Sequence, residues 1–212
     1  AIKVDDIAYW EGATGFASRN VDASNNLLPG GVPFTTGTLT RIYSPTKMFT
    51  AVLVLELAKE GVLSLDDAIS KYMPLMHLYN PTLDGSVTIH QLLSHESGYS
   101  DWEEEIQMQM AIAFDPTHVW TPYEMMAFTH QISAPGTVRR YSHNNFVFLG
   151  FIIETATGRK VEELYRERFF EPLNLQSIYL ELREPHGNRE LLASPHDNIS
   201  VFNPIFQFTG QP

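Results

Sequence analysis

The sequence predicts an α+β protein in which helices predominate and strands are few. Apolar residues recur at helical spacing in several segments, and the longest of these are 45–59 and 142–158. The opening residues 2–20 alternate loosely between apolar and polar side chains, which is typical of a short strand or hairpin. A weaker strand signal lies at 178–182. These few strands cannot complete a sheet. Most of the chain is therefore expected to form a helical domain.

The composition excludes several classes of partner and site. Among 212 residues, 14 are Lys or Arg and 25 are Asp or Glu, which gives a net charge of −11 and disfavours binding to nucleic acid. The chain has no cysteine, so it can form no disulfide, thiolate metal site or cysteine nucleophile. The longest apolar runs, 48–55 and 146–153, are shorter than the roughly 20 residues that a membrane span needs. A soluble globular domain is expected.

After the opening strand signal, a loop leads to the first helix. Residues 21–38 are rich in Asn, Gly and Pro and predict a loop. Helical spacing begins at Pro45 and continues to Lys59, with apolar residues on almost every side, so this helix is expected to be buried nearly all round. Gly61 is a typical residue at which such a helix stops.

Further helices are predicted from capping residues and apolar spacing. Ser64 and Asp67 stand at capping-box spacing before a short helix that ends at Pro74. Thr121 and Pro122 provide the cap and the first residue of another helix. The other expected helices cover 88–95, 101–116, 142–158 and 160–171, whereas residues 173–212 show little periodicity.

A serine and a lysine stand three positions apart where the first helix begins. If Ser44 opens the helix, Lys47 lies one turn further along the same face, so the two side chains can meet. Lysine can then act as the base that activates a serine nucleophile, and the helix N-terminus favours an oxyanion beside Ser44. The alternative is that Ser44 only caps the helix and Lys47 is a solvated charge.

The context of these two residues resembles the serine β-lactamase and penicillin-binding protein superfamily. The segment "SPTKMFTAVLVLELAKEGVLSLDD" resembles its Ser-x-x-Lys nucleophile segment. The segment "VTIHQLLSHESGYSD" is similar to Leu-Leu-x-His-x-Ser-Gly, "APGTVRRYSHNNFVFLGFIIETATG" to the Tyr-x-Asn motif with its helix, and "FFEPLNLQS" to a Pro-Leu-Gly-Met stretch. These ordered matches favour the branch that holds class C β-lactamases, D-alanyl-D-alanine carboxypeptidases, D-aminopeptidases and related esterases.

The resemblance implies a fold and three catalytic residues. The fold is an α/β sandwich of the β-lactamase and transpeptidase type, of which this chain forms mostly the helical domain plus a few strands. Ser44 forms the acyl-enzyme, Lys47 assists its deprotonation, and Tyr141 moves the proton between Ser44 and the leaving group. Ser142 is the companion of Tyr141 and is expected to be structural.

The chain departs from the family pattern at His143, which stands where the motif has Asn. The family's amide holds the substrate carbonyl and contacts the lysine, and an imidazole performs both tasks less readily. His143 and Asn144 are the expected substrate-binding residues. The alternative is that His143 is only the first polar residue of its helix, with Asn144 or Asn145 supplying the amide.

The third motif of the family, Lys-Thr-Gly or His-x-Gly on a strand, is not found. The sequences at Phe208–Gly210 and Pro185–Asn188 resemble it only in part. The resemblance therefore implies that residues 1–212 form one domain that is incomplete at both ends. A missing segment or a complementing chain is expected to carry the third motif.

The predicted function is that of a serine hydrolase acting on an amide or ester through an acyl-enzyme at Ser44. A small molecule or a short peptide is the expected substrate, with esterase or D-peptidase activity favoured over β-lactamase activity. No cofactor is expected, and no metal, because no pair of histidines has the i, i+4 spacing of a zinc motif with a catalytic glutamate between. A periplasmic or extracellular location is favoured. The alternative is a non-catalytic sensor or scaffold protein.

Overall fold

The structure is a computed structural model that describes residues 2–4, 8–22, 24, 26–115, 117–180, 183–185 and 193. The chain divides into two compact units, one formed by Ser44–Ile178 and the other by Ala1–Tyr43 together with Tyr179–Pro212. The larger unit is helical, and the described strands belong to the smaller one. Among the described residues, no helix combines the length and the hydropathy that crossing a membrane requires.

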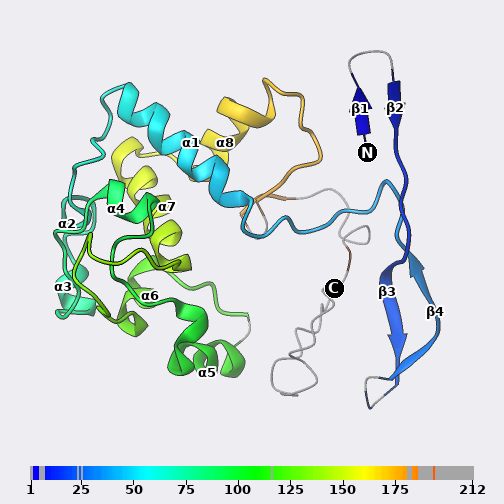
Figure 1. Ribbon diagram of the computed structural model, residues 1–212, viewed down its shortest axis with the longest axis horizontal. Coiled ribbons are helices and arrows are strands. Elements are labelled where there is room, and N and C mark those ends of the chain that lie inside the picture. Colours follow the sequence, from blue (N-terminus) through cyan, green and yellow to red (C-terminus); the bar gives the residue numbers. More distant parts are fainter. Residues whose placement is uncertain are drawn as a thin grey trace. The chain divides into compact units, whose positions relative to one another are not determined.

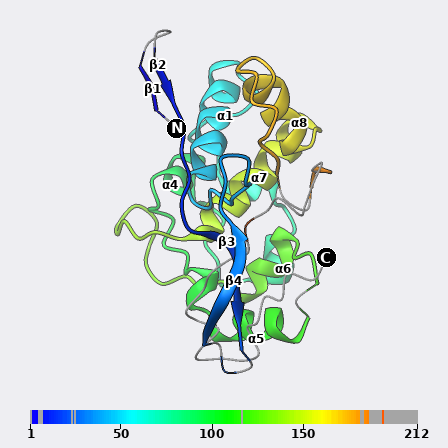
Figure 2. The ribbon, with the colours of Figure 1, turned by 90° about the vertical axis from the view of Figure 1, so that its right-hand side faces the viewer.

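The larger unit is organised around one long central helix, α7 (Figure 1). Helices α1, α2, α4, α6 and α8 all contact α7, and Figure 2 shows α1 and α8 close together on one side of it. The elements of this unit are α1 (Thr46–Lys59), α2 (Ile69–Tyr72), α3 (Met76–Tyr79), α4 (Ile89–Leu93), η1 (Trp102–Glu104), α5 (Ile106–Phe114), α6 (Pro122–Phe128), α7 (His143–Thr157), α8 (Val161–Tyr165) and a π-helical turn, η2 (Arg166–Phe170).

The core of this unit lies where α1 and α4 pack on α7. Apolar side chains one helical turn apart place the same face of α7 in the core, and each large aliphatic side chain buried there contributes about 1.5–3 kcal/mol. The fully or almost fully buried residues at this junction are Leu53, Val54, Leu57, Ile89, Leu92, Phe148, Leu149, Ile152 and Ile153. This packing fixes the N-terminal ends of α1 and α7 in one rigid core.

The N-terminal half of α1 is also fixed against α8 and η2. The ring of Phe49 lies 6.1 Å from that of Tyr165, 5.9 Å from Phe169 and 5.4 Å from Phe170, measured between ring centroids. The Thr50 hydroxyl and the Tyr165 phenol form a buried hydrogen bond of 2.6 Å. These contacts fix the rotation of α1 about its axis.

The expectation that α1 is buried on nearly all sides is wrong. Met48, Val52 and Leu55 are 64%, 45% and 51% exposed. Their spacing places them on one face of the helix, whereas Leu53 and Leu57 face the core. Apolar residues on almost every side of the segment suggest burial all round. Packing against α7 and α8 covers only part of the helix surface.

Several predicted helix ends are confirmed because local hydrogen bonds define them. Thr121 and Glu124 form a capping box at α6, with Pro122 as its first residue. At the end of α7, Gly158 adopts φ 68°, the left-handed conformation in which glycine commonly ends a helix. Thr88 likewise caps α4. These signals need no knowledge of the tertiary structure.

Three other predicted helices differ in their bounds. The Asp67 carboxylate accepts the Ser64 N–H at 2.8 Å, but this pair closes a turn, and α2 begins only after it. The single helix expected over 101–116 is divided into η1 and α5, because Glu105 between them is extended. The helix expected over 160–171 changes to π-helical hydrogen bonding in η2.

Among its described residues, the smaller unit contains two pairs of antiparallel strands. Strand β1 (Ile2–Val4) pairs with β2 (Ala8–Trp10), as the opening alternation predicts. Strand β3 (Phe16–Val21) pairs with β4 (Leu27–Pro33), so the prediction of a loop over 21–38 is wrong for β4. The pairing shifts register twice, and such irregular strands tolerate the Gly and Pro residues that suggested a loop.

The strand expected over 178–182 is not seen in its described part. Residues 178–180 are not in a strand, and 181 and 182 lie outside the described residues. The predominance of helices and the small number of strands are confirmed.

Candidate active site

Ser44 lies immediately before α1 and faces Tyr141. Pro45 occupies the cap position of the helix, and the cap makes no side-chain hydrogen bond, so the alternative that Ser44 is the helix cap is wrong. The Ser44 hydroxyl oxygen instead lies 3.0 Å from the phenol oxygen of Tyr141, which is 97 positions away in the sequence. Both side chains are exposed, so the pair is open to a substrate.

Lys47 contacts the same phenol ring through its charge. Its Nζ lies 5.1 Å from the centroid of the Tyr141 ring and 5.7 Å from that of Phe146. The backbone N–H of Lys47 donates to the Ser44 carbonyl at 2.9 Å, whereas among the described residues its Nζ makes no hydrogen bond to the side chain of Ser44 or Tyr141. The cation thus lies over the ring whose hydroxyl contacts Ser44, so the structure brings together the three predicted catalytic residues.

His143 forms the other side of the cluster. Its Nε2 lies 3.4 Å from the phenol oxygen of Tyr141, and its Nδ1 lies 2.8 Å from Oδ2 of Asp101. The backbone N–H of His143 also donates to Asp101 Oδ2 at 3.2 Å. The Glu103 carboxylate lies 3.7 Å from Nε2. His143 therefore links the phenol to a carboxylate.

His95 packs on the phenol ring from another direction. The two ring centroids are 4.6 Å apart. Nδ1 of His95 accepts hydrogen bonds from the Ser142 N–H at 3.2 Å and from the Asn145 amide at 3.1 Å. Burial, and after it the positive charge of Lys47, lower the pKa of His95, which agrees with an unprotonated Nδ1.

Backbone conformations of high energy occur next to these side chains. Among the described non-glycine residues, Tyr43, His95 and Asn174 have positive φ, with values of 51° and 61° for the first two. Tyr43 directly precedes Ser44, and His95 stacks on Tyr141. Such strain persists where surrounding contacts fix the backbone, and it is concentrated at functional sites.

The two asparagines after His143 do not reach this cluster. Asn144 is fully buried, and its amide donates to the Ser100 carbonyl at 2.9 Å and to the Thr129 hydroxyl at 3.0 Å. Asn145 is also fully buried and binds His95 and Ser97. The structure therefore places Asn144 in the core and not beside Ser44, where a substrate-binding residue was expected. Neither amide replaces His143 at the phenol.

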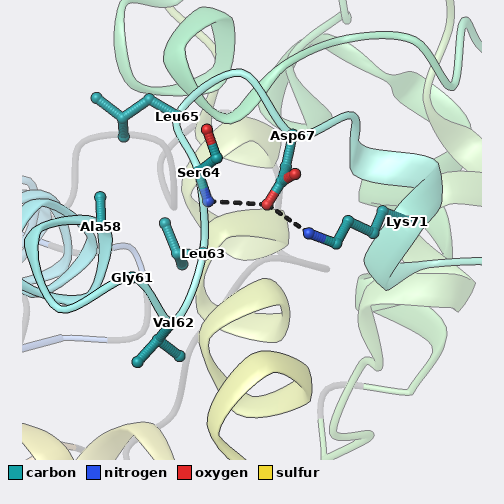
Figure 3. Close-up of a pocket in the computed structure, with 8 residues that line it drawn as sticks. All are labelled: Ala58, Gly61, Val62, Leu63, Ser64, Leu65, Asp67 and Lys71. Carbon is teal, nitrogen blue, oxygen red and sulfur yellow. Dashed lines mark hydrogen bonds and ion pairs between the residues drawn. The ribbon is translucent and has the colours of Figure 1, made fainter.

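An open hollow of about 550 Å³ lies at the other end of α1 (Figure 3). None of the predicted catalytic residues lines it. Asp67 lies in the wall of this hollow. Hydrogen bonds from Lys71, from the Tyr72 phenol and from the Ser64 N–H lower the pKa of its carboxyl to about 2. The charges of the wall are thus paired with one another, and the hollow is separate from the site at Ser44.

The sequence did not identify Asp101 and His95 as parts of the site. Asp101 is 5% exposed and lies 42 positions before His143. The available signal was their place in "SHESGYSD", which resembles a motif of the family but was assigned no chemical role. The partial third-motif matches at Phe208–Gly210 and at 186–188 lie outside the described residues. No cluster suited to a metal ion occurs within the part of the chain that the structure describes.

The chain matches a known protein family and is similar to several known proteins. The family described as beta-lactamase matches residues 16–199. The chain is 28% identical over 185 residues to the D-alanyl-D-alanine-carboxypeptidase/endopeptidase AmpH of Escherichia coli, covering 81% of this chain and 46% of that protein.

Two solved structures are similar in sequence and in fold. The D-amino acid amidase of Ochrobactrum anthropi SV3 superposes with a TM-score of 0.66 at 26% identity, over 85% of this chain and 47% of that one. A D-stereospecific amidohydrolase from Streptomyces sp. gives a TM-score of 0.57 at 34% identity, over 65% of this chain and 43% of that one. The chain thus spans less than half the length of each of these relatives.

Proposed function

Because the chain belongs to the beta-lactamase family and has the α+β fold of that family, we propose that it is a serine hydrolase whose nucleophile is Ser44. The observation that carries the proposal is the 3.0 Å contact between the Ser44 hydroxyl and the Tyr141 phenol, with the charge of Lys47 over the same ring. A nucleophile beside a group that can take its proton is the arrangement that acyl transfer requires.

The reaction proceeds in two halves. Ser44 Oγ attacks the carbonyl carbon of an amide or ester while its proton passes to the Tyr141 oxygen and the phenol's own proton moves to a neighbouring base. The N-terminus of α1 favours the developing oxyanion. Tyr141 then returns the proton to the leaving amine or alcohol, which leaves an ester at Ser44. Water hydrolyses this ester by the same proton transfers in reverse order. Lys47 favours the charge that the phenol carries during the transfer.

The substrate class we propose is an amide or ester of a D-amino acid. The names of the three relatives, a D-alanyl-D-alanine carboxypeptidase/endopeptidase, a D-amino acid amidase and a D-stereospecific amidohydrolase, all refer to D-configured or D-stereospecific substrates. A short D-peptide or an ester is therefore favoured over a β-lactam.

Hydrolysis of paired D- and L-aminoacyl p-nitroanilides and esters by the complete protein tests this proposal. The D-substrates should be cleaved faster than their L-enantiomers, and Ser44→Ala should lower kcat/KM by several orders of magnitude because the nucleophile is removed. Ser70→Ala, at an exposed serine of α2, is the matched control and should retain full activity. Cleavage by Ser44→Ala at the wild-type rate would overturn the proposal.

The departure at His143 also supports a second candidate, a sensor that is acylated but does not turn over. In that case a D-amino acid ester, the substrate class proposed above, should form a Ser44-dependent adduct that remains attached for hours, with no continued release of the acid product. The proposed hydrolase instead clears the adduct in the course of the assay. Intact mass measured over time separates the two functions.

A further inference from the structure

We propose that Asp101 and His143 are positioning residues that orient the Tyr141 phenol and receive its proton while Ser44 is acylated. This inference rests on the proposed function and adds to it a role for the residue that replaces the family's Asn. Four side chains then form one chain of hydrogen bonds, from Ser44 through Tyr141 and His143 to Asp101.

The Asp101 carboxylate determines which group donates and which accepts in each of these hydrogen bonds. An ionised carboxylate only accepts hydrogen bonds, so the 2.8 Å contact requires a proton on Nδ1 of His143. In the neutral ring, Nε2 is then unprotonated and accepts from the Tyr141 phenol at 3.4 Å. The phenol oxygen in turn accepts from the Ser44 hydroxyl at 3.0 Å. Each donor has an acceptor, and every bond points away from the nucleophile.

Asp101 is itself held rigidly. Its Oδ1 accepts the Glu103 N–H at 3.2 Å, and its Oδ2 accepts both the backbone N–H and the ring of His143. The carboxylate is 7% exposed, whereas the imidazole is 24% exposed. A carboxylate bound in this way fixes both the tautomer and the orientation of the ring, which is what a histidine needs in order to receive a proton reproducibly.

The proton balance of the acylation step is complete. The Ser44 O–H bond breaks as Oγ bonds to the carbonyl carbon, and its proton passes to the Tyr141 oxygen. The proton that Tyr141 held moves to Nε2 of His143, which becomes an imidazolium beside Asp101. When the leaving group departs, the imidazolium returns its proton to Tyr141, and the phenol donates a proton to the leaving nitrogen or oxygen. No other reactant is needed.

Two carboxylates face the ring of His143. Asp101, the residue before η1, lies 2.8 Å from Nδ1 of His143, and Glu103 in η1 lies 3.7 Å from Nε2. Tyr141 faces it from the segment before α7, Lys47 is the positive group on the phenol ring, and His95, whose pKa is lowered, packs on the same ring. Two carboxylates thus lie next to the ring nitrogens. An asparagine here could form hydrogen bonds but could not take up a proton.

The rate of Ser44 acylation as a function of pH tests the inference. A fluorophosphonate probe or a D-amino acid ester is mixed with the complete protein, and the adduct is followed by intact mass. His143→Asn should slow acylation by about 10²–10⁴-fold, the usual contribution of general acid–base catalysis. It should also change the dependence of the acylation rate on pH, because an amide cannot take up a proton. Asp101→Asn should slow acylation less, because the imidazole remains.

A matched control separates this effect from a general loss of stability. His130 and Glu105 form a histidine–carboxylate pair of 2.9 Å elsewhere on the unit, so His130→Asn should leave the rate and its pH profile unchanged. His143→Gln is a second variant, with a longer amide side chain. Its acylation rate should show the same altered dependence on pH. Circular dichroism verifies that each variant is folded.

The outcomes distinguish this inference from the proposed function. A wild-type protein that forms no adduct at Ser44 overturns both. A wild-type protein that is acylated, with His143→Asn or His143→Gln acylated at the same rate and with the same pH profile, overturns only the role of the Asp101–His143 pair. A lower rate with an unchanged profile also contradicts it, because that is the result of a purely structural change.

Discussion

The Tyr141 phenol is the residue on which the proposed chemistry depends. Its oxygen lies near Ser44 and His143, and its ring is contacted by both Lys47 and His95. The hydroxyl serves in proton transfer, whereas the ring serves in packing and in contact with the cation. The two parts of the side chain can therefore be tested separately.

Replacing Tyr141 with phenylalanine should remove the chemistry and keep the fold. We expect kcat/KM for a D-substrate to fall by about 10²–10⁴-fold because no group remains to take the Ser44 proton. The free energy of unfolding should change by less than about 1 kcal/mol, since the side chain is 45% exposed and loses only a hydroxyl. Steady-state kinetics and urea denaturation measure the two effects.

The matched control for this prediction is Tyr79→Phe. Tyr79 is 46% exposed and stacks on Tyr123, so its variant loses the same atom in a similar environment. It should keep full activity. If Tyr141→Phe were as active as Tyr79→Phe, the phenol could not be the group that deprotonates Ser44.

At the scale of single residues, the sequence predicted only those site residues to which a motif assigns a chemical role. Ser44, Lys47 and Tyr141 were found through ordered motifs, and the structure brings them together. Asp101 was not found, because nothing local shows that a carboxylate 42 positions away binds the ring of His143. The expected role of Asn144 rested on adjacency to His143, and a one-residue step in α7 turns its side chain into the core.

At the scale of elements, helices with local caps were predicted best. Thr121 and Gly158 mark ends of α6 and α7 through bonds within a few residues. Strand β4 was missed because its Gly and Pro residues are typical of loops, and only pairing with β3 makes it a strand. The exposed face of α1 was also missed, because burial depends on which helices pack against it.

Two glycines with left-handed backbones should differ sharply when replaced by alanine. Gly158 has φ 68°, and a Cβ there would meet no other atom within 4 Å, so Gly158→Ala should cost only about 1–2 kcal/mol of backbone strain. Gly98 has φ 75°, and a Cβ there would lie 2.0 Å from the Ser133 carbonyl oxygen. Overpacking adds about 1–3 kcal/mol to the same strain, so Gly98→Ala should cost about 2–5 kcal/mol.

Urea denaturation of the two glycine variants measures this difference. Gly98 lies between Ser97 and Tyr99, and its carbonyl accepts the Ile132 N–H at 2.8 Å. Its replacement therefore forces apart two segments that support His95 and Asn145. Equal losses of stability in both variants would show that the contact between Gly98 and Ser133 is not close in solution.

At the scale of the whole molecule, one compact unit holds the complete cluster. Ser44, Lys47, Asp101, Tyr141 and His143 all belong to Ser44–Ile178. The family and the helical character could be predicted because ordered motifs run along most of the chain. The substrate could not, because a pocket depends on more surface than five residues provide, and the chain spans less than half the length of its relatives. That a missing segment or a complementing chain carries the third motif stays a prediction.

The position of the acyl group is the most direct test of the central claim. The complete protein is incubated with a D-amino acid ester, quenched with acid, digested and examined by tandem mass spectrometry. The account predicts one acylated peptide, with the added mass on Ser44, in the wild type, and a much slower appearance of that peptide in Tyr141→Phe. An acyl group on any other residue, or none on Ser44 while the ester is hydrolysed, would contradict it.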